Sequence, residues 1–473
     1  MTKKAFQYSF TLTFGFLVHL FDIRLDLFFI HTSMRIFALT IFAIITLASC
    51  SVTKQLEKSA KKNVLQSEAL QTAHVGISVF EPVTGKYWFN HQGDKYFVPA
   101  SNAKIPTCYA AMKYLGDSLV GLRYSTSHGS RNIVVQPAGD PTFLHPGFGR
   151  QPVLNFFKRD TTAIFMAIDN NWKEESLGSG WSWNDYVQEY MAERSVFPIY
   201  GNVIRFFGRE GRLSIIPRTI NIDYGGTADD IESLNLNSNE YTFTRQRHRN
   251  TFLWDYSSRT IDLLEIPFIT SLSNSLQFLK DTIKGLRISH YRELQLWEAK
   301  KIHSQPTDSL LKPMMHHSDN FFAEQSLLMV SNEHLGVMND AKIIDTLLKT
   351  DFANLPQKPR WAEGSGLSRY NLFTPQDFVF ILNKMKNEFG MARIKEIFPT
   401  GGEGTLSSYY KKDSTFIYAK TGTLSGVVAL SGFLYTKDGK ELIFSVLVNN
   451  HQGSATNVRR AVEKFIQGIR ENF

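Results

Sequence analysis

The chain has 473 residues, of which 43% are hydrophobic and 20% are charged, so it is globular rather than disordered and long enough for two or three domains. Its formal net charge of +8 is spread along the sequence without an arginine-rich block, which favours a solubilising surface over nucleic-acid binding. The sequence contains neither paired metal-ligand cysteines nor a His-Glu-x-x-His motif, so we expect no metal site.

The N-terminal region contains a short apolar run at 36–47, which follows Met34 and leads into Leu-Ala-Ser and Cys50. The run is too short to span a bilayer as a helix. A basic start, a short apolar core and small residues before a cysteine resemble a bacterial lipoprotein signal, in which Cys50 is lipidated and becomes the mature N-terminus. The alternative is a buried N-terminal helix. We expect residues 1–50 to be a signal region that starts at Met34, and 51–72 to be a tether.

Alternating apolar residues then predict a β-hairpin over 74–81 and 86–90, and a mostly apolar helix follows at 98–112. From 118 to 280, short alternating segments are separated by glycine, asparagine and aspartate, which predicts a strand-rich insert. The tryptophans of Gly180-Trp181-Ser182-Trp183 are interpreted as a packing element.

Longer elements return in the last third of the chain. Thr374 and Pro375 are typical of a helix start, and Asp438-Gly439 predicts a hairpin turn between two strands. The expected helices are 271–284, 309–331, one that starts at 375, and 455–470, and the expected strands are 429–436 and 441–449. The N-terminal hairpin and these strands can share one antiparallel sheet, which implies an α+β core interrupted by the insert.

Ser101 and Lys104 stand one helical turn apart at the start of the 98–112 helix. Residues at i and i+3 share a face, so the amine can reach the hydroxyl. A serine hydroxyl is a poor nucleophile at neutral pH, but a desolvated amine beside it can accept its proton. Ser51 and Ser59 fit the same Ser-x-x-Lys pattern within the tether, so the pattern alone is more often a polar helix face.

A second candidate is Ser318-Asp319-Asn320, at a predicted helix entry. There a hydroxyl and an amide two residues apart can face one cleft, where Asn320 can bond the lysine of the first motif and Ser318 can relay a proton to a leaving amine. The alternative is a helix N-cap, which serine and asparagine both favour. Similar triplets begin at Ser182 and Ser233.

The third candidate is Lys420-Thr421-Gly422-Thr423, at the end of a strand predicted for 416–419. A lysine there can attract a substrate carboxylate, and Gly422 lets a substrate pass close to the backbone. An extended peptide can then pair with this edge strand. The alternative is a strand end with a solvated lysine.

Together and in this order, the three motifs resemble those of the penicillin-recognising serine enzymes. The long insert after the nucleophile helix is similar to that of the low-molecular-mass class C penicillin-binding proteins, the S13 D-alanyl-D-alanine carboxypeptidase/endopeptidase family. That family usually has aspartate where Glu363 stands. Further similarity lies in Gly139-Asp140-Pro141-Thr142, Gly180-Trp181-Ser182-Trp183, Glu363-Gly364-Ser365-Gly366-Leu367-Ser368-Arg369 and Gly404-Thr405-Leu406.

The resemblance implies an α+β, β-lactamase/transpeptidase-like catalytic domain formed by 73–117 and 281–473, with 118–280 inserted. It also implies that Ser101 attacks the carbonyl between two terminal D-alanines of a peptidoglycan stem peptide. Lys104, uncharged because it is buried and near a second lysine, would take the proton. Penicillins would be trapped on the same serine.

The remaining roles follow from the same resemblance. Ser318 and Lys420 would return a proton to the departing amine, and Asn320 would order the site. Backbone N–H groups of Ser101 and Thr423 would form the oxyanion hole. The resemblance implies no cofactor. The residues expected to bind substrate are Thr421, Gly422 and Thr423.

Two rival functions stay open. A β-lactamase or esterase of the same fold would keep Ser101 and Lys104 but turn β-lactams over, and the long insert argues against it. A catalytically silent peptidoglycan-binding lipoprotein would not acquire penicillin, and the three intact motifs argue against it. The expected partners are peptidoglycan stem peptides, β-lactams as inhibitors and, through Cys50, a membrane. We expect a periplasmic location on a lipid anchor, in the outer membrane. Carboxypeptidase and endopeptidase activity cannot be separated by sequence because both cleave after D-alanine.

Overall fold

The computed structural model describes residues 53–126, 131–160, 162–209, 212–218, 221–224, 243–254 and 261–473. The chain divides into two compact units, residues 1–60 and 61–473, and the elements below belong to the second. The predicted signal region, Met34 and Cys50 lie outside the described residues. Among the helices that the structure describes, none has the length and apolar character needed to cross a bilayer.

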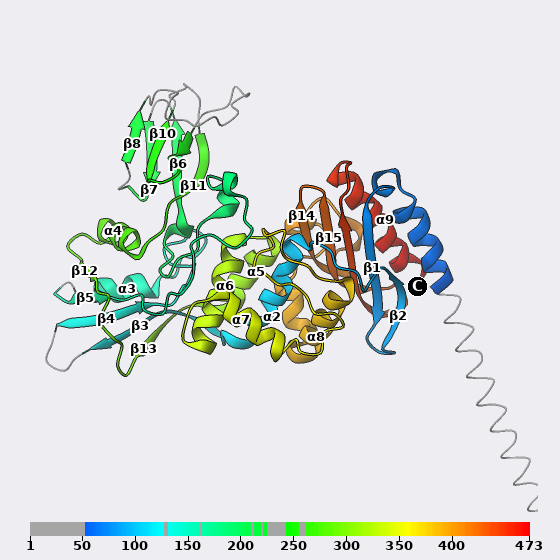
Figure 1. Cartoon of the computed structure of the whole chain (residues 1–473), viewed down its shortest axis with the longest axis horizontal. Helices are drawn as coiled ribbons and strands as arrows, with labels where there is room; N and C mark the ends of the chain where they lie inside the picture. Colours follow the sequence, from blue (N-terminus) through cyan, green and yellow to red (C-terminus); the bar gives the residue numbers. More distant parts are fainter. Residues whose placement is uncertain are drawn as a thin grey trace, which may run out of the picture. The chain divides into compact units, whose positions relative to one another are not determined.

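A five-stranded antiparallel sheet joins the two ends of the chain in the order β14-β15-β16-β1-β2 (Figure 1). The predicted N-terminal hairpin pairs with the C-terminal strands through β1 and β16, where His74 lies opposite Asn449. The α+β prediction for this core is confirmed. The strands are β1 (His74–Glu81), β2 (Lys86–His91), β14 (Ile417–Leu424), β15 (Val427–Tyr435) and β16 (Glu441–Asn449).

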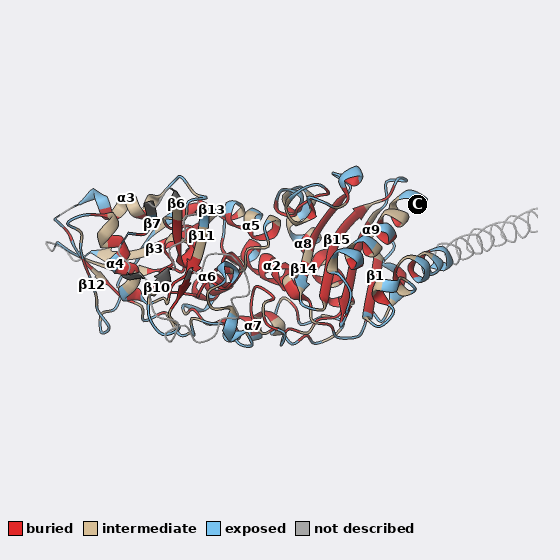
Figure 2. Ribbon diagram, turned by 90° about the horizontal axis from the view of Figure 1, so that it is seen from above, coloured by how far each residue is buried: buried red, intermediate tan, exposed pale blue. Residues whose placement is uncertain are grey.

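Helices cover both faces of this sheet. Alternate residues of β15 point in opposite directions, so that Phe433 packs in one core cluster with Phe378 of α8 (Pro375–Ile397). Val428 and Leu430 instead line a small cavity with Val462 of α9 (Ala455–Asn472). Figure 2 shows the strands of the sheet as the buried layer between exposed outer helix surfaces. The predicted start of α8 is confirmed, since the Thr374 side chain accepts a hydrogen bond from the Asp377 N–H.

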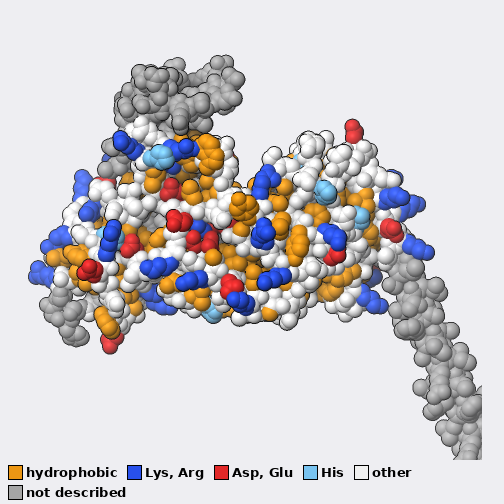
Figure 3. Space-filling model, viewed as in Figure 1, with side chains coloured by type: hydrophobic (Ala, Val, Ile, Leu, Met, Phe, Trp, Pro, Cys, Tyr) orange, Lys and Arg blue, Asp and Glu red, His pale blue; other side chains and the backbone are white. Residues whose placement is uncertain are grey.

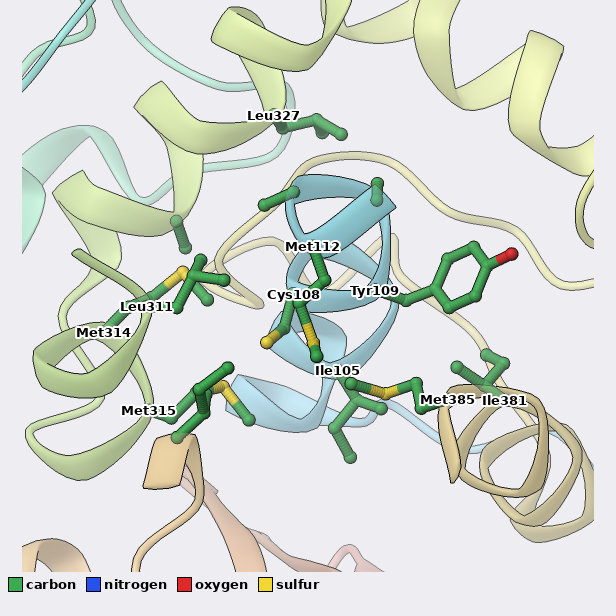
Figure 4. Packing of buried hydrophobic residues seen from close by; sticks show 14 of the residues in the cluster. Ile105, Cys108, Tyr109, Met112, Leu311, Met314, Met315, Leu327, Ile381 and Met385 are labelled. Carbon is green, nitrogen blue, oxygen red and sulfur yellow. The ribbon is translucent and has the colours of Figure 1, made fainter. Parts of the chain in front are cut away.

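The 3₁₀ turn η3 (Ala100–Ala103) leads directly into α2 (Lys104–Tyr114), which is buried along most of its length. Its apolar side chains pack against α5 (Thr307–His316) and α8, as Figure 4 shows for Cys108 and Met315. Cys108 is fully buried, which confirms that it is a small core residue rather than an exposed thiol. The helix that follows Ser101 is therefore held on several sides by the core.

The helical stretch predicted for 309–331 is two helices rather than one. α5 ends at His316 and α6 (Asn320–Leu335) begins four residues later, with Ser318 at a left-handed φ of 61° between them. The Asp319 carboxylate accepts the Phe322 N–H and caps α6. Because the cap is Asp319, neither Ser318 nor Asn320 is used for capping.

Helix α6 is buried on all sides over Phe321–Asn332, including its polar residues. The Gln325 amide donates to the carbonyls of Gly139 and Ser195 at 2.8 and 2.9 Å. One turn from its end, Asn332 accepts from the Asn171 amide at 3.0 Å. These partners all lie in the insert, so α6 is a wall shared by the insert and the catalytic core.

The insert contains a mixed five-stranded sheet, in the order β12-β5-β4-β3-β13, and two three-stranded sheets. Its last two strands lie beyond residue 280, where the insert was expected to end, and β13 pairs with β3. We therefore propose that the insert runs from 118 to 306. Its elements are β3 (Ser118–Thr126), β4 (Asn132–Pro137), α3 (Pro152–Arg159), β5 (Ile164–Ala167), β6 (Val203–Arg209), β7 (Arg212–Ile216), β8 (Asn221–Tyr224), β9 (Phe243–Arg245), β10 (Thr251–Trp254), β11 (Ile261–Pro267), α4 (Leu272–Thr282), β12 (Arg287–His290) and β13 (Lys300–Pro306).

Part of the predicted tether is folded. Residues 61–70 form two short helical turns, η1 (Lys61–Leu65) and η2 (Glu68–Leu70), which contact α9. Val64 and Leu70 are buried there, because each offers an apolar side chain within an otherwise polar segment.

On the face seen in Figure 3, the described Lys and Arg side chains are scattered among acidic ones, as their spread along the sequence predicts. A further helix, α7 (Asp340–Lys349), follows α6.

Candidate active site

The Lys104 ammonium group lies beside the Ser101 hydroxyl at the junction of η3 and α2. Its Nζ is 3.0 Å from Ser101 Oγ, 2.6 Å from Asn320 Oδ1 and 2.6 Å from the Ser365 carbonyl oxygen. A neutral amine has two N–H bonds and one lone pair. The two carbonyl-type oxygens can only accept, so they take both N–H bonds, and the lone pair is left for the proton of Ser101. This arrangement suits a general base.

Burial lowers the pKa of Lys104 to about 8, because the charged form is desolvated. The Glu363, Asp319 and Glu324 carboxyl groups oppose this shift. The direction agrees with the prediction of an uncharged base, and burial, one of the two expected causes, is the largest cause. Near neutral pH, about a tenth of Lys104 is therefore neutral and available to accept a proton, far more than for an ordinary lysine.

Ser318, which lines the same cleft as Ser101, meets Lys420 of β14. Lys420 Nζ donates to Ser318 Oγ at 2.8 Å and to the Thr421 carbonyl at 2.9 Å, and the lysine is fully buried. Burial, with repulsion from Lys104 added, holds the pKa of Lys420 well below its ordinary value. Lys420 lies inside β14 and not at a strand end, and its amine is not solvated. The pair forms a second amine–hydroxyl unit that can move a proton.

Two glycines let separate segments approach the backbone of the nucleophile. A Cβ on Gly366 would lie 2.0 Å from the Ala100 carbonyl oxygen, and Gly366 has a φ of 91°. A Cβ on Gly422 would lie 2.7 Å from the Pro99 carbonyl oxygen and 3.0 Å from the Ser101 nitrogen. Gly422 was expected to make room for substrate, but here its missing side chain makes room for the nucleophile's own turn.

The two threonines of the third motif differ in position. Thr421 Oγ1 donates to Thr405 Oγ1 at 2.8 Å, and Thr421 does not line the cleft. Thr423 does line the cleft, and Arg459 of α9 donates to its hydroxyl at 2.6 Å. β14 is an edge strand of the sheet, which leaves this side of Thr423 next to the cleft.

A cleft of about 760 Å³ brings Ser101, Ser318, Asn320 and Thr423 together. The insert supplies its opposite wall, which the sequence motifs did not predict. Trp181 lines that wall and donates to Glu363 Oε2 at 3.3 Å, whereas Trp183 is 68% exposed, so these tryptophans are not a packed cluster. The cleft residues from the insert and from the loop before α8 are Gly180, Trp181, Ser182, Asp185, Tyr190, Met191, Gly366, Leu367 and Arg369.

Two more missed residues hold Lys104, Ser365 directly and Glu324 through Ser365. Ser365 presents its carbonyl to the amine, and its N–H donates to Glu324 Oε1 at 2.7 Å. The available signal was Glu324 next to Gln325 inside an apolar helical stretch, since buried charged side chains need partners. Within the described ranges, no three His, Cys, Asp or Glu side chains gather as metal ligands.

Known proteins that resemble this chain include D-alanyl-D-alanine carboxypeptidases. A D-alanyl-D-alanine carboxypeptidase of Actinomadura sp. (strain R39) is 25% identical over 441 residues, covering 83% of this chain and 80% of that protein. The D-alanyl-D-alanine carboxypeptidase DacB of Haemophilus influenzae is 30% identical over 158 residues, covering 31% of this chain and 33% of that protein. The crystal structure of penicillin binding protein 4 (dacB) from Haemophilus influenzae shares the fold, with a TM-score of 0.67 and 18% identity over 87% of this chain and 98% of that one.

The model of the D-Ala-D-Ala carboxypeptidase 3 (S13) family matches residues 56–208 and 296–469, which together are more than half of the sequence. The two matched segments contain all three motifs, and the gap between them falls within the insert. The chain therefore belongs to the D-Ala-D-Ala carboxypeptidase 3 (S13) family.

Proposed function

We propose that this enzyme, a serine-type D-alanyl-D-alanine carboxypeptidase by its family, cleaves peptidoglycan stem peptides through an acyl-enzyme on Ser101. The observation that carries the assignment of Ser101 is its place 3.0 Å from a buried lysine whose other two neighbours are acceptors only. Ser182 lines the same cleft, but its hydroxyl bonds Asn184 rather than a lysine. Cleft exposure alone therefore does not distinguish the nucleophile, whereas the adjacent amine does.

In the acylation step, Ser101 Oγ forms a bond to the carbonyl carbon of the penultimate D-alanine while its proton passes to Lys104 Nζ. The carbonyl oxygen becomes an oxyanion, which the N–H groups of Ser101 and Thr423 are placed to stabilise. Support for this comes from the closeness of the two segments, since the Ser101 nitrogen would lie 3.0 Å from a Cβ on Gly422.

The bond from the carbonyl carbon to the leaving nitrogen then breaks, and Ser318 gives its proton to that nitrogen and regains one from Lys420. Lys420 in turn receives the proton that Lys104 took from Ser101, so both amines are neutral again before deacylation. The hydrogen bond of 2.8 Å between Lys420 and Ser318 supports this relay. A water molecule next attacks the ester, gives one proton to the base, and releases the peptide as a carboxylic acid while Ser101 Oγ is reprotonated. Carboxypeptidase and endopeptidase reactions share these steps and differ only in the leaving amine.

The family acts on the bacterial cell wall, so the enzyme works outside the cytoplasm. Within that location, we infer that the chain is a lipoprotein held through Cys50 at the periplasmic face of the outer membrane. The short apolar run before Cys50 supports the anchor. The inferred partners are stem peptides and, as inhibitors, β-lactams. The Haemophilus influenzae penicillin binding protein 4 has also been crystallised in complex with a β-lactam.

Mass spectrometry of the protein after exposure to penicillin tests the proposal. We expect one covalent penicillin per chain on a peptide that contains Ser101, and no adduct on Ser101→Ala. Ser182→Ala is the matched control, because that serine lines the same cleft, and it should acquire penicillin normally. An adduct that persists in Ser101→Ala contradicts the assignment.

Two assays on the same protein separate the rival functions. Release of D-alanine from a pentapeptide reports carboxypeptidase activity, and cleavage of cross-linked dimers reports endopeptidase activity. Sustained hydrolysis of nitrocefin would instead favour a β-lactamase, and failure to acquire penicillin would favour a silent wall-binding protein.

A further inference from the structure

Arg194 is a buried arginine of the insert that reaches into the catalytic core. It is 1% exposed, and its guanidinium donates to Asp340 Oδ2 at 2.6 Å, to Glu174 Oε1 at 3.2 Å and to Glu324 Oε2 at 3.4 Å. The carbonyls of Glu175 and Leu177 accept further bonds from it. A guanidinium with this many acceptors has a fixed position and a charge that cannot be removed by deprotonation.

Glu324 connects this guanidinium to the catalytic amine. One carboxylate oxygen of Glu324 faces Arg194, and the other accepts the N–H of Ser365 at 2.7 Å. The carbonyl of the same Ser365 accepts from Lys104 Nζ at 2.6 Å. The connection therefore runs from the insert, through one side chain of α6 and one loop residue, to the proposed base.

Glu363 ties the same loop together from the other side. Its carboxylate accepts the N–H of Gly366 at 2.8 Å and the indole N–H of Trp181 at 3.3 Å, and it also bonds the Ser365 hydroxyl. Trp181 in turn lies under Arg194, whose guanidinium carbon is 5.8 Å from the ring centre. The loop that holds Lys104 is thus fixed by two buried carboxyl groups, and both are in contact with the insert.

The charges around Lys104 explain why a cation is needed there. Glu363 faces it from the loop before α8, Asp319 and Glu324 from α6, and Lys420 from β14. Two of the carboxyl groups, Glu324 and Glu363, form a coupled pair, in which the pKa of Glu324 is raised by burial and by Glu363. Without a compensating positive charge, this group of acids favours protonated Lys104, which cannot act as a base.

We propose that Arg194 is a positioning residue for the acylation step: through Glu324 it holds the Ser365 carbonyl against Lys104, and its charge offsets the buried carboxyl groups around that amine. The inference rests on the proposed function, because it takes Lys104 as the base. Arg194 is not itself a catalytic residue, since it does not line the cleft. A merely structural ion pair is the competing interpretation.

The pH dependence of acylation by a fluorescent penicillin distinguishes the two interpretations. In Arg194→Gln the lost cation should raise the pKa of Lys104, so the acid limb of the rate profile should move to higher pH. If that pKa rises by about one, the rate at neutral pH should fall by about tenfold, because the fraction of neutral amine falls by the same factor. Arg205→Gln is the matched control: Arg205 is a buried arginine of the insert paired with Glu265 at 2.6 Å, and it should lose stability without moving the limb.

Two further variants test whether Arg194 acts through Glu324 and whether its charge alone is enough. Arg194→Gln with Glu324→Gln removes one cation and one acid together, so the limb should return toward its wild-type position. Arg194→Lys keeps the charge but not the planar set of donors, so the rate should fall at every pH while the limb stays in place. This variant also decides the question if Arg194→Gln does not fold.

Each outcome of these experiments contradicts a different part of the proposal. Wild type that acquires no penicillin at any pH contradicts the proposed function itself. If the wild type is acylated but the acid limb of the rate profile lies at the same pH in Arg194→Gln and in Arg205→Gln, only the role of Arg194 is overturned. If the acid limb of the double variant stays at the higher pH of Arg194→Gln, Arg194 does not act through Glu324. If Arg194→Lys is acylated at the wild-type rate, Arg194 does not position the Ser365 carbonyl.

Discussion

The two walls of the cleft are built in different ways. The wall from the catalytic core comes from η3, the start of α6 and β14, and its reactive groups stand two or three residues apart in short motifs. The wall from the insert comes from the irregular segment around 180–191, with little regular structure of its own. That wall is held in place by long-range bonds, such as the one at 3.0 Å from the Asn320 amide to the Tyr190 carbonyl.

This difference separates two tasks. Local secondary structure brings the Ser101 hydroxyl and the Lys104 amine together, because residues at i and i+3 share a helical face. Contacts between distant segments then set the charge and the exact contacts of those amines, as Glu324, Glu363 and Arg194 do around Lys104. If the two walls differ in this way, substitutions in the core wall should abolish acylation, and substitutions in the insert wall should change its rate only moderately.

The largest effect is expected from removing the base itself. Lys104→Gln should lower the rate of acylation by penicillin by about 10²–10⁴-fold, the usual contribution of a general base. The control is Lys113→Gln on the same helix, whose amine is partly exposed and pairs with Asp351, and this variant should react normally. Time courses of labelling with fluorescent penicillin measure both. Equal rates in the two variants would remove Lys104 from the mechanism.

Gly366 tests how closely the loop must approach the nucleophile. Gly366→Ala puts a Cβ 2.0 Å from the Ala100 carbonyl oxygen, so we expect a loss of about 1–3 kcal/mol in unfolding free energy and slower acylation. Gly336→Ala is the matched control, because Gly336 also has a left-handed φ, of 74°, but its Cβ would meet nothing within 4 Å. It should cost about 1 kcal/mol from backbone strain alone and leave acylation unchanged. Chemical denaturation and penicillin labelling together detect the difference, and similar labelling by the two variants would count against a tight approach.

The pH dependence of the wild type follows from the environment of Lys104. Its pKa is lowered to about 8, so the neutral base is lost as the pH falls through that value. Acylation should therefore be half-maximal near pH 8, level off above about pH 9, and fall by about tenfold per pH unit below about pH 7. Circular dichroism over the same pH range checks that the protein stays folded. A rate that does not change between neutral and mildly alkaline pH is the contrary result.

The smallest effect is expected from the insert wall. Trp181→Phe removes the indole N–H that donates to Glu363 at 3.3 Å while keeping an aromatic ring, so acylation should slow by only about 2–10-fold, the equivalent of one modest hydrogen bond. Trp183→Phe is the control, because that side chain is 68% exposed, and it should have no effect. If Trp181→Phe matches Lys104→Gln in severity, the two walls are not functionally different.

Much of the core could be predicted because its signals are local. The alternation in β1 and β2 and the Thr374-Pro375 start of α8 are encoded within a few residues. The division of 309–331 into two helices was missed because apolar periodicity continues on both sides of Ser318. A serine with positive φ leaves no compositional signal of the break, unlike a glycine.

Prediction of the site was limited in the same way, to residues that are marked by local motifs. Ser101, Lys104, Ser318, Asn320 and Lys420 were selected by motif and spacing, and the fold brings all five to one cleft or its floor. Arg194 could not be selected, because its contact with Glu324 joins residues far apart in the sequence, and nothing near Arg194 marks it as buried. The role of Gly422 toward a substrate stays a prediction, and the sequence did not reveal that the turn at Pro99–Ser101 also needs the space.

The shared helix α6 has a consequence for protein engineering. Gln325 and Asn332 find their partners in the insert, while Asn320 on the same helix accepts a hydrogen bond from Lys104. Excising the insert to obtain a smaller hydrolase would strip these amides of their partners and expose an apolar helix to water. A chimaera that transplants the insert between relatives would therefore have to carry α6 with it.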